Sequence, residues 1–298
     1  MKRKPIVALI YDFDGTLSPG NMQEFGFIQA VGKTPEEFWR MSDGLAVGQD
    51  ASNVLAYMKM MFDEARKNGI RLKKSSFRAF GKDITLFKGV REWFGLINEY
   101  GESHGVRIEH YINSSGLKEI IEGSPIAKEF KHIFACSFMY NEKGEAEWPG
   151  IAVDYTNKTQ YIFKINKGIF SANDSKKVNS SVAEEKKRIP YQQMIYFGDG
   201  DTDIPSMKIV TMFMSAFCTV SDRRSVQPHS RNKLPSIRQP ISGAVDGRSR
   251  MTKMVTMIGK RIFSVLETGR DCTILILRSA SEVMSFMIGG WIIGMSAM

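Results

Sequence analysis

The residues with the clearest chemical potential are Asp12 and Asp14, in the segment Asp12-Phe13-Asp14-Gly15-Thr16. They follow the apolar run from Ile6 to Tyr11, which predicts a buried strand. Side chains two positions apart on an extended chain project to the same side, and in an open α/β sheet ligands bind beyond the carboxyl ends of the strands. Two carboxylates placed in this way suit a nucleophile and a proton donor.

A second candidate segment, Tyr111 to Gly116, runs from an expected strand into an expected helix that continues from Leu117 to Ile121. It contains Ser114 and Ser115. A hydroxyl group beside free backbone N–H groups at a helix start favours an anion, and the helix dipole adds to this preference. We therefore expect Ser114 and Ser115 to bind phosphate, with Ser114 holding one of its oxygens.

Lys158 follows an extended stretch and opens an apparent helix from Thr159 to Ile165. A lysine at that place can act as a point charge on a phosphate group and can offset the repulsion between the acid pair and an incoming anion. A single lysine at a helix start is more commonly an exposed surface residue, so the position of Lys158 does not by itself assign it to a binding site.

A third acidic segment lies at Met194 to Asp203, where an apolar strand ends in glycine and a cluster of aspartates that includes Asp199 and Asp203. Hard oxygen ligands at a strand end suit Mg²⁺, which binds through one or two carboxylates and keeps several waters. A Gly/Asp cluster alone is more often a turn. The four segments together favour a phosphate and Mg²⁺ site.

The elements that must position these residues are short apolar strands separated by helix-like stretches. This alternation predicts an α/β fold with a doubly wound, Rossmann-like parallel sheet. The interval between the first two strands far exceeds the dozen or so residues that a crossover needs, which indicates an inserted subdomain. The insert has helical patterns, and the expected strands span residues 6–12, 106–114, 132–138 and 194–198.

Residues about 6 to 210 resemble the haloacid dehalogenase superfamily, and in particular its phosphoserine-phosphatase-like members with a helical cap. The family pattern is an aspartate pair in the form DxDGT, a Ser or Thr that closes the second strand, a lysine, and a GDGxxD motif. The resemblance implies a catalytic core at residues 1–18 and 100–220, a helical cap at 19–99 after the first strand, and an atypical tail at 221–298.

The same resemblance implies a role for each matching residue. Asp12 corresponds to the nucleophile that forms an aspartyl-phosphate, and Asp14 to the acid that protonates the leaving oxygen and then activates water. Asp199 corresponds to the metal-binding carboxylate, with Asp12 and the Asp14 backbone completing the protein's share of the Mg²⁺ shell, while Asp203 supports that shell. Asp201 lies between them. Lys164 and Lys176 are alternatives to Lys158, because the interval from Lys158 to Asp199 is long for this family.

These roles imply an Mg²⁺-dependent phosphatase that acts on a small phosphorylated metabolite. Halide-releasing relatives lack the acid at the position of Asp14. A phosphomutase or a catalytically idle phosphate-binding regulatory module are the alternatives. Phosphoserine phosphatases carry a glutamate shortly after the first motif, whereas this chain has Gly20-Asn21 there and Glu24 further on; Glu24, Trp39 and Arg40 are candidate pocket residues.

Composition narrows the remaining possibilities. The three cysteines form no CxxC pair, which favours a reducing compartment, and we expect a cytoplasmic protein with no membrane or nucleic-acid partner. The net charge of +9 resides mostly in residues 211–298, with 12 Lys and Arg against 5 Asp and Glu, compared with 29 against 27 in residues 1–210.

The sequence after Val210 changes in character, because it is basic and polar before it ends in an apolar stretch. We expect a solvated, partly disordered segment there. Packing of the apolar end against the core and attachment at a membrane interface are alternatives. One hypothesis is that a reading-frame shift just after Val210 accounts for the change.

Overall fold

The computed structural model describes residues 4–210 of the chain. Its centre is a five-stranded sheet with the strand order β4-β3-β2-β1-β5. The pairs β1–β2, β1–β5 and β2–β3 are parallel, and β3–β4 is antiparallel. The strands span Ile6–Tyr11 (β1), Arg107–Leu117 (β2), Phe130–Tyr140 (β3), Ala146–Ile151 (β4) and Met194–Phe197 (β5).

The expected α/β fold with a largely parallel sheet is confirmed, and the four strands predicted from apolar runs are β1, β2, β3 and β5. The strand β4 was not predicted. It lies at an edge of the sheet and contains Pro149 and Gly150, and proline is tolerated only where no ladder hydrogen bond is lost. Pro149 and Gly150 interrupt its sequence, so no continuous apolar run marks β4 as a strand.

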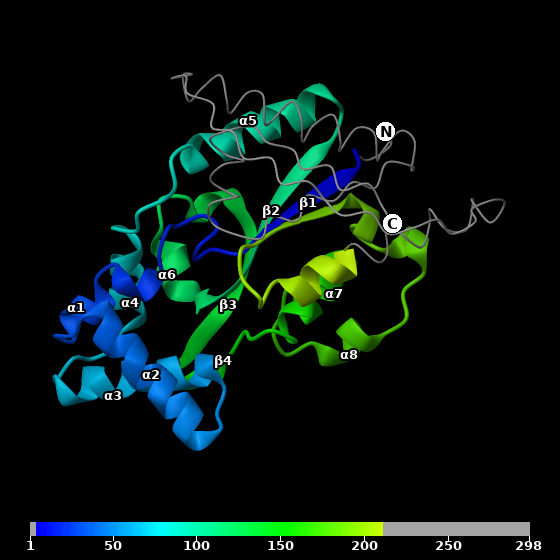
Figure 1. The fold of residues 1–298 in the computed structure, drawn as a ribbon. Coiled ribbons are helices and arrows are strands. Elements are labelled where there is room, and N and C mark those ends of the chain that lie inside the picture. Colours follow the sequence, from blue (N-terminus) through cyan, green and yellow to red (C-terminus); the bar gives the residue numbers. More distant parts are fainter. Residues whose placement is uncertain (1–3, 211–298) are drawn as a thin grey trace, which may run out of the picture.

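Helices cover both faces of the sheet (Figure 1). They span Phe27–Ala30 (α1), Pro35–Gln49 (α2), Asn53–Lys67 (α3), Lys74–Gly81 (α4), Val90–Ser103 (α5), Lys118–Gly123 (α6), Lys158–Lys167 (α7) and Ser175–Asn179 (α8). Single 3₁₀ turns lie at Met22–Glu24, Ala127–Glu129, Glu184–Lys186 and Tyr191–Gln193.

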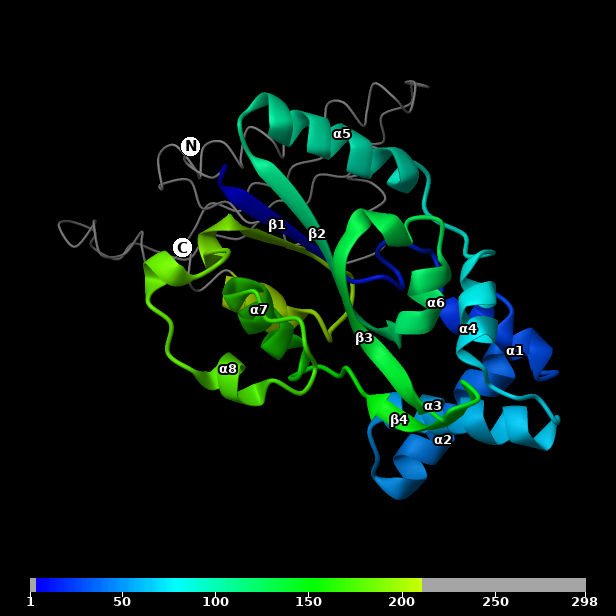
Figure 2. The same ribbon diagram turned by 180° about the vertical axis from the view of Figure 1, so that it is seen from behind.

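Aromatic side chains pack on each face of the sheet. On one face Tyr11 stacks on Phe197 with ring centroids 5.0 Å apart and meets Phe94 of α5 edge-on. On the other face Phe134 of β3 stacks on Tyr161 of α7 at 4.7 Å. This packing fixes β1 in the middle of the molecule, with α5 and α6 on one side of the strands and α7 on the other (Figure 2).

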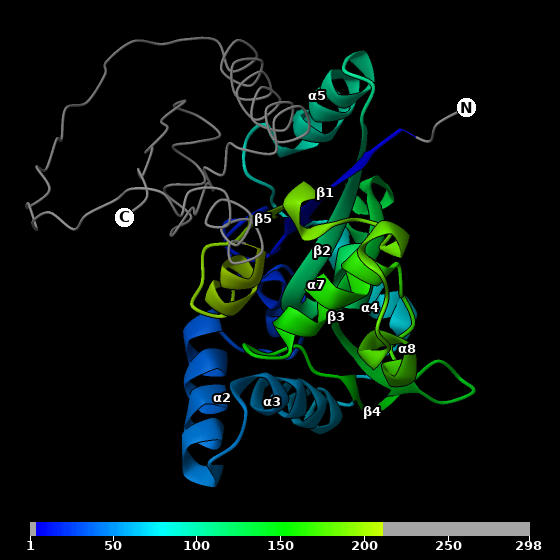
Figure 3. The ribbon, with the colours of Figure 1, turned by 90° about the vertical axis from the view of Figure 1, so that its right-hand side faces the viewer.

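The helices α1 to α4 lie together in Figure 1, and in Figure 3 α2 and α3 lie at the end of the described molecule opposite α5. They come from the expected insert, and the helices expected from the Thr34-Pro35 start signal and from residues 53–67 are α2 and α3. The side chain of Thr34 caps α2 by accepting a hydrogen bond from the Glu37 N–H group at 3.2 Å. The division into a core and a cap stays a prediction, and the packing of α5 on Tyr11 favours assigning α5 to the sheet.

Among residues 4–210, no helix combines the length and the apolar character needed to cross a membrane. The predictions for the basic and apolar tail at 221–298, and the frameshift hypothesis after Val210, lie outside the described residues.

Candidate functional site: an acidic cluster at the carboxyl end of β1

The strand order places β1 between β2 and β5, so β2 and β3 lie on one side of β1 and β5 lies on the other. A crevice at such a switch point is where ligands bind in open α/β sheets. Asp12 follows β1 directly, and its N–H group donates to the carbonyl of Phe197 at the end of β5 at 2.9 Å. This backbone contact brings the chain after β1 beside the loop that carries Asp199 and Asp203.

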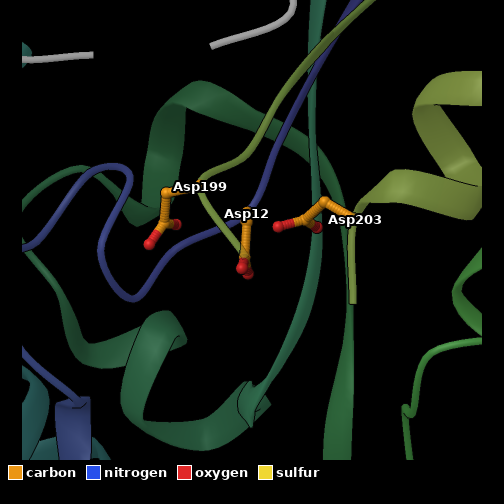
Figure 4. Close-up of side chains that lie close together, drawn as sticks. All are labelled: Asp12, Asp199 and Asp203. Atoms are coloured by element: carbon orange, nitrogen blue, oxygen red, sulfur yellow. The ribbon is translucent and has the colours of Figure 1, made fainter. Parts of the chain in front are cut away.

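The carboxylates of Asp12, Asp199 and Asp203 converge in that crevice (Figure 4). One oxygen from each lies within 4.8 Å of the others. Figure 4 shows Asp12 between the other two, with the side chain of Asp203 directed toward it. The two acidic segments that the sequence singled out, about 190 positions apart, therefore form one cluster.

Lys158 is the cation of this cluster. Its Nζ lies 2.8 Å from Oδ1 of Asp203 and 3.2 Å from Oδ2 of Asp12, and its side chain is fully buried. Burial alone lowers the pKa of Lys158, but the two carboxylates outweigh burial and the net shift is upward, so the ammonium group stays charged. Asn113 of β2 steadies the start of α7 by donating from Nδ2 to the Lys158 carbonyl at 3.1 Å.

The charge of the cluster is not balanced by the protein. Burial and the charge of Asp203 raise the pKa of Asp12 to about 7, although Lys158 opposes the shift. Burial also raises the pKa of Asp199, against the hydrogen bond from Thr16. Three carboxylates with one lysine leave negative charge that a further cation would stabilise.

Asp14 lies beside this cluster, and its pKa is raised as well. Burial, followed by the charges of Asp12 and Glu24, raises the pKa of Asp14 well above its usual range, even though the Met22 N–H group donates to its Oδ1 at 3.0 Å. A carboxyl group that keeps its proton can donate it. Burial thus raises the pKa of both acids of the first motif; Lys158 limits the shift of Asp12, and the neighbouring carboxylates add to the shift of Asp14.

The loop after β1 folds tightly over Asp199. Gly15 has a φ of 75°, and a Cβ atom at this position would lie 2.1 Å from Oδ2 of Asp199. The next residue, Thr16, donates from its hydroxyl group to Oδ1 of Asp199 at 2.7 Å. Residue 15 must therefore be glycine, because its backbone is left-handed and because the Asp199 carboxylate lies where a Cβ atom would be.

Ser114 and Ser115 lie at the end of β2, next to β1 in the sheet. Oγ of Ser114 accepts from the Gly116 N–H group at 3.1 Å, which leaves its own proton free to donate. Oγ of Ser115 is buried and has no hydrogen-bond partner among the described residues. A Cβ atom on Gly116 would lie 3.0 Å from Oδ2 of Asp14, so this segment reaches the acid pair.

The expectation that backbone N–H groups stand free at this helix start needs a refinement. The strand β2 continues to Leu117, and the Leu117 N–H group donates to the sulfur of Met22 at 3.0 Å. Thioether sulfur is a weak acceptor, so an anionic oxygen would compete well for this donor. Met22 is fully buried and covers the place that the sequence suggested for an anion.

The two alternative lysines and one acid lie away from the cluster. Nζ of Lys164 donates to the carbonyls of Ser171 and Ala172 at 3.0 and 3.2 Å, and Lys176 is exposed. Asp201 is exposed as well, although it belongs to the same motif as Asp199. Geometry therefore favours Lys158 over Lys164 and Lys176.

The three pocket candidates from the insert have different environments. Glu24 and Trp39 are half-buried and joined, because Nε1 of Trp39 donates to Oε1 of Glu24 at 2.8 Å. Arg40 is exposed. The negative charge of Glu24 acts on Asp14, so the Glu24–Trp39 pair belongs to the surroundings of the acid pair.

Sequence reasoning missed three residues that shape the site. The hydroxyl of Tyr57 in α3 donates to the Ser115 carbonyl at 2.7 Å, and the hydroxyl of Tyr196 in β5 donates to Oδ1 of Asp203 at 2.8 Å. Met22 is the third. Tyr196 lies in the apolar run before the acidic motif, Tyr57 lies in the helix expected at residues 53–67, and Met22 lies in a polar segment, so no sequence signal marked any of them as a site residue.

The residues present fit a divalent cation. Asp12 and Asp199 offer hard carboxylate oxygens, and the surplus negative charge favours a cation. Asp203 already accepts from Lys158, from Tyr196 and from the Gly200 N–H group at 3.2 Å. We therefore regard Asp12 and Asp199 as candidate direct ligands and Asp203 as a residue that orients Lys158.

Comparison with known proteins finds related sequences and structures. A family model described as haloacid dehalogenase-like hydrolase matches residues 9–208. An uncharacterized protein of Borreliella burgdorferi is 30% identical over 233 residues, which cover 70% of this chain and 80% of that protein.

Among solved structures, a hydrolase described as a member of the HAD family, from Salmonella enterica serovar Typhi, has a TM-score of 0.48 and 14% identity over 70% of this chain and 61% of its own length. A substrate-bound phosphoserine phosphatase has a TM-score of 0.44 and 16% identity over 69% of this chain and 83% of its own.

Proposed function

The chain belongs to the haloacid dehalogenase-like hydrolase family, and from this premise we propose that it hydrolyses a small phosphomonoester with Mg²⁺ and an aspartyl-phosphate intermediate. The observation that carries the proposal is the meeting of Asp12, Asp199 and Lys158 in one buried cluster beside a carboxyl group of raised pKa. A cytoplasmic location, expected from the cysteine pattern, is part of the proposal.

In the first step a carboxylate oxygen of Asp12 attacks the phosphorus atom, and the ester P–O bond breaks. Asp12 suits this role because the Phe13 N–H group donates to its Oδ1 at 2.7 Å and Lys158 contacts its Oδ2, which fixes the carboxylate. The departing oxygen takes the proton of Asp14, whose raised pKa favours the protonated form.

In the second step a water molecule attacks the phosphorus atom of the aspartyl-phosphate. Asp14, now ionised, accepts the proton of the water, and the P–O bond to Asp12 breaks to release inorganic phosphate. Lys158 and the hydroxyl of Ser114 would hold phosphoryl oxygens through both steps, since each offers a buried donor beside the acids. A divalent cation at Asp12 and Asp199 would neutralise the charge of the transferred group.

The test is phosphate release from a panel of phosphorylated metabolites by the purified full-length chain, with Mg²⁺ and with chelator. We expect Mg²⁺-dependent release that the Asp12→Asn variant lacks. An isomerised phosphosugar without net phosphate release would instead identify a phosphomutase, and binding of phosphoesters without turnover would identify a regulatory module.

A further inference from the structure

A basic cavity of about 500 Å³ lies on the insert, away from the acidic cluster. Its wall contains five cationic side chains and no carboxylate; they are Lys73, Lys74, Arg78, Lys82 and Lys143. We call this feature the basic pocket. Residues 1–210 carry almost as many acidic as basic side chains, so this concentration does not follow from the composition of this part of the chain.

The helix α4 supplies one wall of the basic pocket. Lys74, Arg78 and Lys82 recur at four-residue spacing and are exposed, so they share one face of α4. The adjoining face carries the buried residues Phe77 and Gly81 and packs on α6. Figure 2 shows α4 beside α6, and the cationic side chains of α4 are exposed to solvent.

The turn between β3 and β4 supplies the other wall, and backbone hydrogen bonds hold it against α4. The Lys74 N–H group donates to the Gly144 carbonyl at 3.1 Å, and the Ala146 N–H group donates to the Leu72 carbonyl at 2.7 Å. Within the turn, Oδ1 of Asn141 accepts from the N–H groups of Lys143 and Glu145, both at 3.0 Å. These bonds fix the backbone of Lys143 beside the first turn of α4, so the two walls of the pocket are held together by backbone contacts.

The charges in the basic pocket are only partly neutralised. Arg78 forms an ion pair with Glu122 at 2.5 Å, and Nζ of Lys74 lies 5.8 Å from the centre of the Tyr140 ring. Lys73, Lys82 and Lys143 have no carboxylate partner within residues 4–210. Like charges gathered without partners repel one another, which an anionic ligand would relieve.

The chemistry of the wall indicates which ligand it fits. The volume is in the range of small-molecule sites, roughly 300–1,000 Å³. Four lysines act as point charges for phosphate oxygens, and the pocket lining contains no aromatic ring on which a nucleobase could stack. We propose that the basic pocket binds a small anion with several phosphate groups, recognised through its phosphates alone and at a site separate from the acidic cluster.

The test is calorimetric titration of the full-length chain with inorganic tripolyphosphate. The titrated protein carries the Asp12→Asn substitution and the buffer contains chelator, so the tripolyphosphate is not hydrolysed during the titration. In this background the triple variant Lys73→Gln, Lys82→Gln, Lys143→Gln removes the three unpaired lysines without touching a described side-chain contact. A matched control replaces three other exposed lysines, Lys128, Lys131 and Lys186, with glutamine.

We expect the pocket variant to weaken tripolyphosphate binding by about 10-fold or more, and the control variant to bind almost as the parent does. Ser114→Ala, which alters the acidic site, should leave this binding unchanged, and the triphosphate of a nucleotide should bind about as tightly as tripolyphosphate. Binding should weaken as salt is added.

Four results would overturn the inference. The first is that tripolyphosphate does not bind, and the second is that the pocket and control variants lose affinity equally. The third is that Ser114→Ala abolishes tripolyphosphate binding while the pocket variant still binds it as the parent does. The fourth is that a single-stranded RNA binds and tripolyphosphate does not. The third result would assign the anion to the acidic site, and the fourth would identify a nucleic-acid surface. None depends on whether the chain hydrolyses phosphoesters.

Discussion

At the scale of single residues, the first motif holds two aspartates whose surroundings push them toward different tasks. Asp12 accepts from the Phe13 N–H group and contacts Lys158, both of which favour its ionised form. Burial raises the pKa of both groups, to about 7 for Asp12, and the charges of Asp12 and Glu24 add to the shift of Asp14. A nucleophile and a proton donor need this difference.

The first prediction concerns Asp14. Asp14→Asn should lower kcat by about 10²- to 10⁴-fold for an alkyl phosphate, because the leaving oxygen then receives no proton. An aryl phosphate with an acidic leaving group should lose much less in the first step. Steady-state and burst kinetics with the two substrates measure this, and equal losses in the first step for both would contradict the assigned proton transfer.

The second prediction separates the aspartates of the GDGxxD motif. Asp199→Asn should weaken Mg²⁺ binding by more than the roughly 10- to 100-fold expected when a supporting residue is lost, and Asp203→Asn should fall within that range. Asp201 is exposed, so Asp201→Asn is the matched control and should bind Mg²⁺ as the parent does. Titration calorimetry reports the three affinities; a loss in Asp201→Asn equal to that in Asp199→Asn would refute the ligand assignment.

At the scale of elements, the contact between α4 and α6 depends on two glycines. A Cβ atom on Gly81 would lie 2.1 Å from the Ile120 carbonyl oxygen, and one on Gly123 would lie 1.9 Å from the Arg78 carbonyl oxygen. The two helices thus touch through backbone, which brings the insert against the helix that follows Ser114.

The third prediction follows from this contact. Gly81→Ala should lower the free energy of unfolding by about 1–3 kcal/mol, because the helices must move apart. The control is Gly44→Ala in the exposed part of α2, where nothing lies within 4 Å of the added carbon; it should raise that free energy by about 0.4–1 kcal/mol. Urea unfolding compares the two, and a neutral Gly81→Ala would show that the contact is looser than described.

Elements and site residues differed in how far the sequence predicted them. Apolar runs predicted β1, β2, β3 and β5, because buried parallel strands need continuous apolar sequence. The acids were predictable because they follow those runs. Met22 and Tyr57 were not, since their roles arise from tertiary contacts with Leu117 and Ser115 that leave no local pattern.

At the scale of the whole molecule, the acidic site should make stability depend on pH and metal. The folded pKa of Asp12 is raised from 3.8 to about 7, and those of Asp14 and Asp199 are raised as well. Folded protein therefore binds more protons than unfolded protein, so the free energy of unfolding falls as the pH rises through this interval. The acidic cluster is a cost to folding at neutral pH that a bound cation would offset.

The fourth prediction is that metal-free protein has a lower Tm at about pH 8 than at about pH 6, and that Mg²⁺ raises the Tm more at the higher pH. Asp12→Asn cannot ionise at this position, so its Tm should change less with pH. Thermal unfolding with chelator and with Mg²⁺ measures both effects. A Tm of the parent that rises between these pH values, with no difference in Asp12→Asn, would contradict the charge balance described for the cluster.

The most direct test of the central claim, our fifth prediction, is to look for the phosphoryl group on Asp12 itself. Rapid acid quench during turnover of a phosphomonoester with Mg²⁺, followed by peptide mass spectrometry, should find the mass of a phosphoryl group on the peptide that contains Asp12. The modification should be absent with chelator and in Asp12→Asn, and should accumulate in Asp14→Asn if water attack becomes slow. Turnover by a protein whose Asp12 is never modified, or by Asp12→Asn, would contradict the account.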